Sequence, residues 1–302
     1  MFLLFASLVG CSGPAAPSVP PVQIALALGE DDAELAGCVL NDGELACFGD
    51  PPLPSVVGPD SLLAGSTRRL NYSTWMCATD ADGCVVCNDH DQERALPAQP
   101  CGMRTLDTQF HSVATDGHSV WVVSEFDGTL SAPVSRAAPG VTAASKSCTL
   151  TDVGTLTCEN FDGDLIQMDD GVTSFVATGA RDVLYLTEDG ALRSGNHQGA
   201  PLVEERSFQG VQQVAGASSQ ACVLHDDGAV ACTQDLEMLT ELDPEWVDVP
   251  LASPARAVHV SRLFGCALLD DDTLTCWDVP ELTTEVFPYD VPLLPRPFPS
   301  SR

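Results

Sequence analysis

The chain has 302 residues, of which 44% are hydrophobic and 13 are cysteines, and its net charge is −30 at neutral pH. A chain of this length and hydrophobicity can bury a large core, so its composition excludes general disorder. The charge excludes nucleic acid as a partner and excludes attachment to anionic lipid through a basic surface, because both require clustered lysine and arginine.

Residues 1–10 form a short apolar run that ends at Cys11. The stretch Leu8-Val-Gly-Cys11 resembles the lipobox of bacterial lipoprotein signal peptides, in which the signal is cleaved before a cysteine that is then lipidated. The run is too short for a transmembrane helix. It departs from the signal-peptide pattern in one respect, because no Lys or Arg precedes the apolar residues. We expect residues 1–11 to be a signal peptide with lipidation at Cys11, and residues 12–21, rich in Ser, Pro and Ala, to be a flexible linker. An ordinary signal peptide or a chance cysteine is the alternative.

From residue 22 onward one hairpin motif recurs, and its clearest copy is Cys222-Val-Leu-His-Asp-Asp-Gly-Ala-Val-Ala-Cys232. Pairing Cys222 with Cys232 leaves Asp226-Asp227-Gly228 as a three-residue loop. Such a loop needs a left-handed residue at its third position, which is usually Gly. The two cysteines then fall at a non-hydrogen-bonded pair, where cross-strand side chains come closest, so we expect a disulfide between them.

Further copies of this hairpin follow the same rule. The predicted disulfides across them are Cys77–Cys87, Cys148–Cys158, Cys266–Cys276 and, around the two-residue loop Asp42-Gly43, Cys38–Cys47. Two copies without cysteines have their turns at Gly128 and Gly190. The turns at positions 43, 83, 128, 154, 190, 228 and 272 are 26 to 45 residues apart, and the 26-residue interval predicts one reduced unit.

Seven such units, each of three or four short strands, predict an all-β, seven-bladed β-propeller with short, disulfide-stapled hairpins over residues 22–286. Both faces of the hairpins are apolar, which favours stacked blades over a sandwich with one solvent face. No window has a helical period, so we expect few helices. Residues 287–302 are rich in Pro and are predicted to be a C-terminal tail, with a last strand that closes the ring as the alternative.

The remaining cysteines, Cys84 and Cys101, are predicted to pair with each other. Cys84-Val-Val-Cys87 also has the spacing of a metal or redox motif. Residues three apart on a strand point to opposite faces, however, so structural disulfides are favoured and no metal is expected. A disulfide framework places the protein in an oxidising compartment.

Several repeats resemble those of the regulator-of-chromosome-condensation family in its short bacterial, cysteine-bearing form. The resemblance rests on residues 214–232, on Gly265-Cys266 with Cys276-Trp277, and on Gly37-Cys38 with Cys47-Phe48-Gly49. It implies a seven-bladed propeller of a family used mostly as binding platforms. The Gly-Gln-Leu-Gly-like run of the family is missing from every repeat, so we transfer no partner or activity.

No catalytic motif is found, and no cofactor is expected. The aromatic residues Tyr72, Trp75, Trp121 and Trp246 are candidates for an exposed binding patch, with burial in the core as the alternative. We therefore expect a monomeric, non-enzymatic lipoprotein of the bacterial cell envelope, at the outer membrane or cell surface, that binds a protein or glycan. The alternatives are a secreted inhibitor-type or adhesion-type propeller, and a lyase or glycosidase that uses the central channel.

Overall fold

The computed structural model describes residues 22–28, 35–66, 75–88, 93–95, 101–107, 112–117, 119–123, 125–126, 129–130, 134–137, 140–145, 147–160, 162–178, 182–196, 200–204, 208, 210–217, 220–233, 246–261, 264–278 and 288–296. Every regular element in these ranges is a β-strand. They contain no helix of the length and apolar character needed to cross a membrane.

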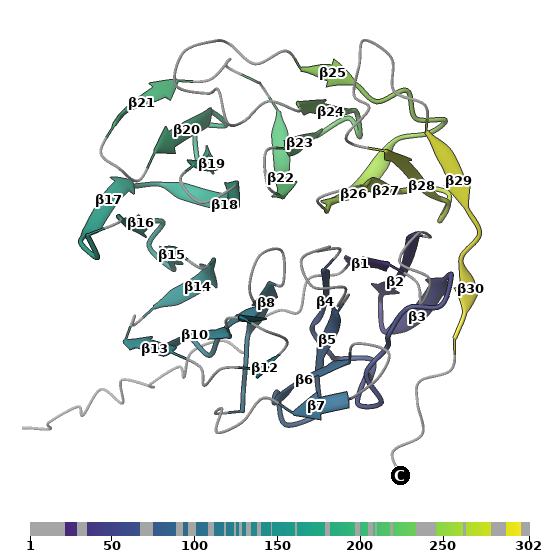
Figure 1. The fold of residues 1–302 in the computed structure, drawn as a ribbon. Coiled ribbons are helices and arrows are strands. Elements are labelled where there is room, and N and C mark those ends of the chain that lie inside the picture. The colour runs from purple at the N-terminus through teal and green to yellow at the C-terminus, as the bar shows by residue number, and fades with distance from the viewer. Residues whose placement is uncertain are drawn as a thin grey trace, which may run out of the picture.

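The described strands form seven antiparallel four-stranded sheets and one two-stranded sheet, arranged around a common centre (Figure 1). The first three sheets contain β1 (Val22–Leu28), β2 (Leu35–Asn41), β3 (Glu44–Phe48) and β30 (Leu294–Pro295); β4 (Leu63–Ser66), β5 (Trp75–Thr79), β6 (Val85–Asn88) and β7 (Glu93–Ala95); and β8 (Thr105–Asp107), β9 (Ser112–Thr115), β10 (Ser119–Val123) and β13 (Val134–Ala137). The two-stranded sheet contains β11 (Glu125–Phe126) and β12 (Thr129–Leu130).

The other four sheets each use four strands that are consecutive in the chain. They contain β14 (Val141–Ala144), β15 (Cys148–Thr151), β16 (Leu156–Glu159) and β17 (Leu165–Asp169); β18 (Val172–Thr178), β19 (Asp182–Thr187), β20 (Leu192–Asn196) and β21 (Ala200–Glu204); β22 (Val211–Ala217), β23 (Gln220–His225), β24 (Val230–Thr233) and β25 (Val247–Asp248); and β26 (Ala255–Val260), β27 (Phe264–Leu269), β28 (Leu274–Asp278) and β29 (Tyr289–Val291).

Six of the seven predicted hairpins have the predicted register. Cys222 lies opposite Cys232 and Leu224 opposite Val230, and Gly228 has a φ of 81°. In the last hairpin Asp272 takes the left-handed position with a φ of 65°, as expected for the residue that replaces glycine there. The structure contains six disulfides in its described part, and they join the six pairs predicted from the sequence.

The seventh predicted hairpin, around Gly128, is wrong as a repeat unit. Its flanks, β11 and β12, pair only with each other, in the connection between β10 and β13. The sheet itself turns between β9 and β10, where Gly117 has a φ of 84°. Gly117 lies 34 residues after Gly83 and 37 before Gly154, so this unit has four strands and is not reduced. The Asp-Gly signal was real, but it belongs to an inserted hairpin.

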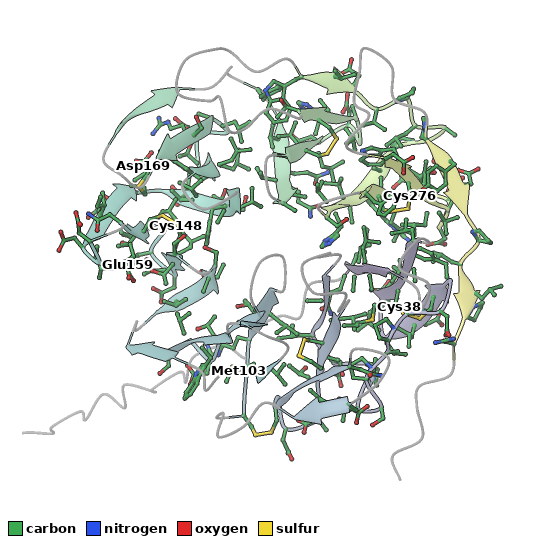
Figure 2. The ribbon with its side chains drawn as sticks, viewed as in Figure 1. Cys38, Met103, Cys148, Glu159, Asp169 and Cys276 are labelled. Atoms are coloured by element: carbon green, nitrogen blue, oxygen red, sulfur yellow. A yellow bond between two sulfur atoms is a disulfide. The ribbon has the colours of Figure 1, made fainter. Side chains whose placement is uncertain are left out.

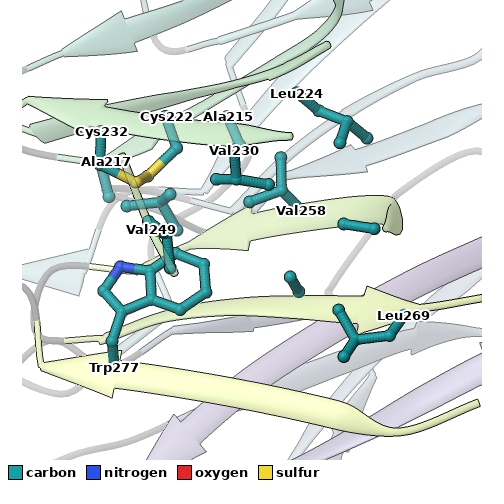
Figure 3. Close-up of a cluster of buried hydrophobic side chains, with 13 residues drawn as sticks. Ala215, Ala217, Cys222, Leu224, Val230, Cys232, Val249, Val258, Leu269 and Trp277 are labelled. Atoms are coloured by element: carbon teal, nitrogen blue, oxygen red, sulfur yellow. A yellow bond between two sulfur atoms is a disulfide. The ribbon is translucent and has the colours of Figure 1, made fainter. Parts of the chain in front are cut away.

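Each hairpin disulfide lies between its own sheet and the next one around the ring, which for Cys266–Cys276 is the first sheet of the chain. Cys222 and Cys232 pack in one cluster with Val258, Leu269 and Trp277 of the following sheet (Figure 3). The opposite face of the same hairpin packs on the preceding sheet, as the apolar character of both faces predicts. The core is therefore a series of layers between neighbouring sheets.

The glycine before the first hairpin cysteine makes room for the aromatic residue after the second. A Cβ atom on Gly265 would overlap the indole ring of Trp277, which is completely buried. A Cβ atom on Gly37 would lie 2.9 Å from the ring of Phe48. These two motifs therefore serve packing between a strand and its neighbour.

The predicted C-terminal tail contains two strands of the sheets, and this corrects the boundary at residue 286. β29 pairs with β28, and β30 pairs with β3, with Leu294 opposite Cys47. The Arg296 N–H donates to the Leu45 carbonyl (2.9 Å), and the Arg296 side chain pairs with Asp50 (3.6 Å). A strand from the end of the described chain thus completes the first sheet.

Candidate functional site

The turns between the second and third strands of the sheets form one edge of the molecule, which we call the hairpin rim. In the last four sheets its turns are residues 152–154, 188–190, 226–228 and 270–272. Backbone hydrogen bonds join them to residues at the start of the next sheet and to residues just before the first strand of their own sheet. The Ala255 N–H at the start of β26 donates to the Gly228 carbonyl of the preceding hairpin, and the Asp270 N–H donates to the Pro254 carbonyl (both 2.9 Å). These bonds hold the rim in place independently of its side chains.

An acidic side chain occupies the first turn position in each of these four sheets, and we call these residues the acidic row: Asp152, Glu188, Asp226 and Asp270. All four are exposed. Their backbone N–H groups make equivalent bonds to the carbonyls of Gly140, Gly171, Gly210 and Pro254. The row therefore presents carboxylates at a regular interval along the rim, with their backbone positions set by the sheet repeat.

Few cations balance this edge. Arg193 pairs with Asp169 (2.6 Å) and lies 3.9 Å from Asp189, and Arg256 pairs with Asp272. No ion pair to a member of the acidic row is found among the described residues. The row therefore presents negative charge to solvent that none of the described cations pairs with.

A pocket of about 330 Å³ lies among the first strands β1, β4, β8, β22 and β26. Two glutamines bridge neighbouring strands in its wall. Gln23 donates to the Ser61 carbonyl (2.9 Å) and accepts from the Leu63 N–H (2.7 Å). Gln213 donates to the Val258 carbonyl (2.9 Å) and accepts from the Val258 N–H (3.2 Å). Both side-chain amides are thus committed to the fold.

Arg104 and His259 also line this pocket. The Cys84–Cys101 disulfide and a hydrogen bond from the Met103 N–H to the Gly83 carbonyl (3.1 Å) position the segment that contains Arg104; Met103 is labelled in Figure 2. His259 Nε2 is buried and has no hydrogen-bond partner. Burial lowers the pKa of His259 to about 4, so its imidazole is neutral at neutral pH.

The sequence did not single out Arg104 or His259. A signal for His259 existed in the repeat itself. His259 lies opposite Cys266, and the residues opposite the first cysteine in three other sheets are Ala25, Ala64 and Ala215. Three other sheets have alanine at this position, so a large polar residue there is a local departure from the repeat.

Of the four candidate aromatic residues, the two whose side chains are described, Trp121 and Trp246, do not share an exposed patch. Trp121 packs against the cluster around Cys77 and Cys87, whereas Trp246 packs in a different cluster and lies edge-on to Phe208 at 5.0 Å. Both indoles are half-buried between sheets. Trp75 is part of β5, but its side chain lies outside the described residues, as do Tyr72, Cys11 and the whole of 1–21. Among described residues no group of His, Cys, Asp and Glu is arranged to hold a metal ion.

No protein-family model and no curated protein matches the chain. Among solved structures it is similar to Prp20p of Saccharomyces cerevisiae, with 13% identity and a TM-score of 0.57 over 92% of this chain and 87% of that one. It is similar to PorZ of Porphyromonas gingivalis (13%, 0.59), covering 90% of this chain and 39% of PorZ. It is also similar to the β-propeller domain of Myceliophteria thermophila Cps50 (13%, 0.55), over 84% of this chain and 95% of that one. These likenesses show a β-propeller fold.

Proposed function

We propose that this protein is a non-enzymatic, lipid-anchored propeller of the bacterial cell envelope that binds a protein partner through the hairpin rim. In this proposal the seven four-stranded sheets are seven blades built from repeats of the regulator-of-chromosome-condensation type, and β11–β12 is an insertion in the third. Support for the compartment comes from the six disulfides, since such bonds persist in oxidising environments.

The observation that supports a binding face best is the acidic row of Asp152, Glu188, Asp226 and Asp270 on a rim held by backbone hydrogen bonds. An array of like charges with fixed spacing attracts a surface of opposite charge and repels a surface of the same charge. It thereby raises the rate of association with the partner and fixes how the two surfaces align. The partner is therefore a protein with a basic, extended or ridged surface.

A protein partner is favoured over a glycan because the described indoles of Trp121 and Trp246 pack between sheets. Binding is favoured over glycosidase activity because the described residues that line the central pocket include no Asp or Glu, whereas glycoside hydrolysis commonly uses a pair of carboxyl groups. Among similar folds, Prp20p has binding properties toward Gsp1p and histones, and PorZ is a bacterial surface component of a secretion system. Both are consistent with a platform role at different sites in the cell.

The test compares two charge-neutralised variants of the mature protein as baits for cell-envelope extract. One carries D152N, E188Q, D226N and D270N together. The control carries D162N and D164N in the exposed turn between β16 and β17, at the opposite edge. Each change removes a charge and retains the side-chain size, so the turns keep their shape.

A partner that the wild type and the control retain, that the row variant loses, and that added salt releases would support the proposal. Equal retention by the row variant would show that binding does not use this rim. Retention of no protein at low salt would contradict the platform role itself. The anchor is tested separately, because C11A is expected to release the protein from membranes, and continued sedimentation with them would contradict lipidation at Cys11.

A further inference from the structure

The central pocket has the size and lining of a small-molecule site. Its volume of about 330 Å³ lies within the range of known ligand pockets. Val22, Ile24 and Leu106 give it an apolar wall, and Arg104 and His259 add polar groups. Because five different sheets contribute to the wall, the pocket is a product of the assembled ring.

Arg104 is exceptional among the described arginine side chains. Arg193, Arg256 and Arg296 each pair with an aspartate. Arg104 makes no ion pair within the part of the chain that the structure describes. In a chain with 43 acidic and 13 basic residues, an arginine in a pocket that pairs with none of the described carboxylates is a suitable group to bind an anionic ligand.

The other polar groups of the pocket leave this charge unopposed. The amides of Gln23 and Gln213 are bonded to backbone atoms of neighbouring strands. His259 is neutral, and its buried Nε2 has no partner among the described residues. Of the described residues that line the pocket, Arg104 is thus the one with a charged side chain.

We propose that the central pocket binds a small organic monoanion, a carboxylate with a short apolar chain. The guanidinium of Arg104 would take the carboxylate by paired, charge-assisted hydrogen bonds. The apolar chain would lie against Val22, Ile24 and Leu106. The Arg104 guanidinium also lies against Gly117, in the turn between β9 and β10, so the pocket reaches the hairpin rim there. The pocket is distinct from the acidic row, because no member of the row lines it.

The probe is hexanoate, titrated into the full mature protein with intact disulfides and followed by ligand-detected NMR or calorimetry. Hexanamide, which has the same shape without the charge, is titrated in parallel. Hexanoate is expected to bind at least about tenfold more tightly than hexanamide, because hydrogen bonds between ionised partners are roughly twice as strong as neutral ones. R104Q should remove this preference.

The control is R296Q, which changes an arginine at the outer edge beside β3 and should leave the preference intact. Circular dichroism verifies that each variant remains folded. Absence of hexanoate binding to the wild type, or an unchanged preference in folded R104Q, would overturn the proposal. If R104Q does not fold, the wild-type comparison decides: equal affinity for hexanoate and hexanamide would overturn the proposal equally.

Discussion

The sheet of β22–β25 has a disulfide across its second and third strands, and the sheet of β8, β9, β10 and β13 has none. The first packs on β26–β28 through a large buried cluster that includes Trp277 and both cysteines (Figure 3). The described cluster between β10 and β14 contains only Val120, Val141 and Ala144. Among the described side chains, the first sheet therefore has the larger buried cluster and a cross-link, and the second has a smaller cluster and no cross-link.

This difference predicts which sheet should have the higher local stability. Regions with many buried apolar contacts and a cross-link open rarely, whereas regions with small clusters open more often. We expect the sheet of β8, β9, β10 and β13 to be the first to lose protection from hydrogen exchange. The following predictions test this contrast, starting with the largest effect.

Truncating the core should reveal the contrast most strongly. L224A removes a side chain that is 1% exposed and should cost about 2–5 kcal/mol of unfolding free energy, because it leaves a cavity in a closely packed cluster. V120A, equally buried, should cost about 2 kcal/mol, since it removes less apolar volume from a smaller cluster. Denaturant unfolding measures both. A larger loss for V120A would contradict the ranking.

Acid should weaken the β26–β29 side of the ring through His259. The unfolded imidazole takes a proton near pH 6.5, whereas the folded one does so only near pH 4. Between these values the unfolded state holds more protons, so stability falls as the pH falls through this window, by up to about 3 kcal/mol. H259A, which restores the alanine of the other sheets, should remove that part of the pH dependence. Identical pH profiles of unfolding would refute this assignment.

Removing the hairpin disulfide should make the local stabilities of the two sheets more alike. The C222A/C232A double variant loses a cross-link over ten residues and should lose about 2–3 kcal/mol in the loop-entropy model. Amides of β23 and β24 should then exchange at rates nearer to those of β9 and β10, as measured by hydrogen exchange. Unchanged protection of β23 would show that packing against Trp277 alone sets the stability of that hairpin.

The smallest effect is expected from the inserted hairpin. Replacing residues 125–130 by Gly-Ser-Gly should change the unfolding free energy by less than about 1 kcal/mol, because it shortens a connection whose described strands pair with each other and with no other sheet. G117V is the contrasting variant, since it places a β-branched residue at a φ of 84° in the turn of the sheet itself. If the insertion proved essential and Gly117 dispensable, β9–β10 would not be the hairpin of this unit.

The hairpins could be predicted from sequence because the residues that determine each one lie close together in the chain. A left-handed turn residue, two cysteines at a non-hydrogen-bonded pair and alternating apolar residues all lie within eleven positions, as in residues 222–232. Two units lack hairpin cysteines, and only the one with its turn at Gly190 was placed correctly. In the other, Asp116-Gly117 and Asp127-Gly128 give the same Asp-Gly signal, and without cysteines nothing marked the first as the turn of the sheet.

The central pocket could not be predicted in this way, because its lining comes from strands that are far apart in the chain. Arg104 and His259 approach the same pocket only once the ring is formed. The acidic turns were visible in the sequence, but their shared orientation depends on bonds such as that from the Asp226 N–H to the Gly210 carbonyl (2.6 Å). Local patterns determined the units, and their assembly created the sites.

The pairing of β30 with β3 has a consequence for the timing of folding. Cys47 and Leu294 are 247 residues apart, so β3 is synthesised long before its partner strand. Until then β3 has an unpaired backbone edge, and such an edge can recruit a strand from another chain. Newly made chains are therefore vulnerable to aggregation until residues 294–296 are available, and a nascent chain held in an unfolded state until then would avoid that hazard.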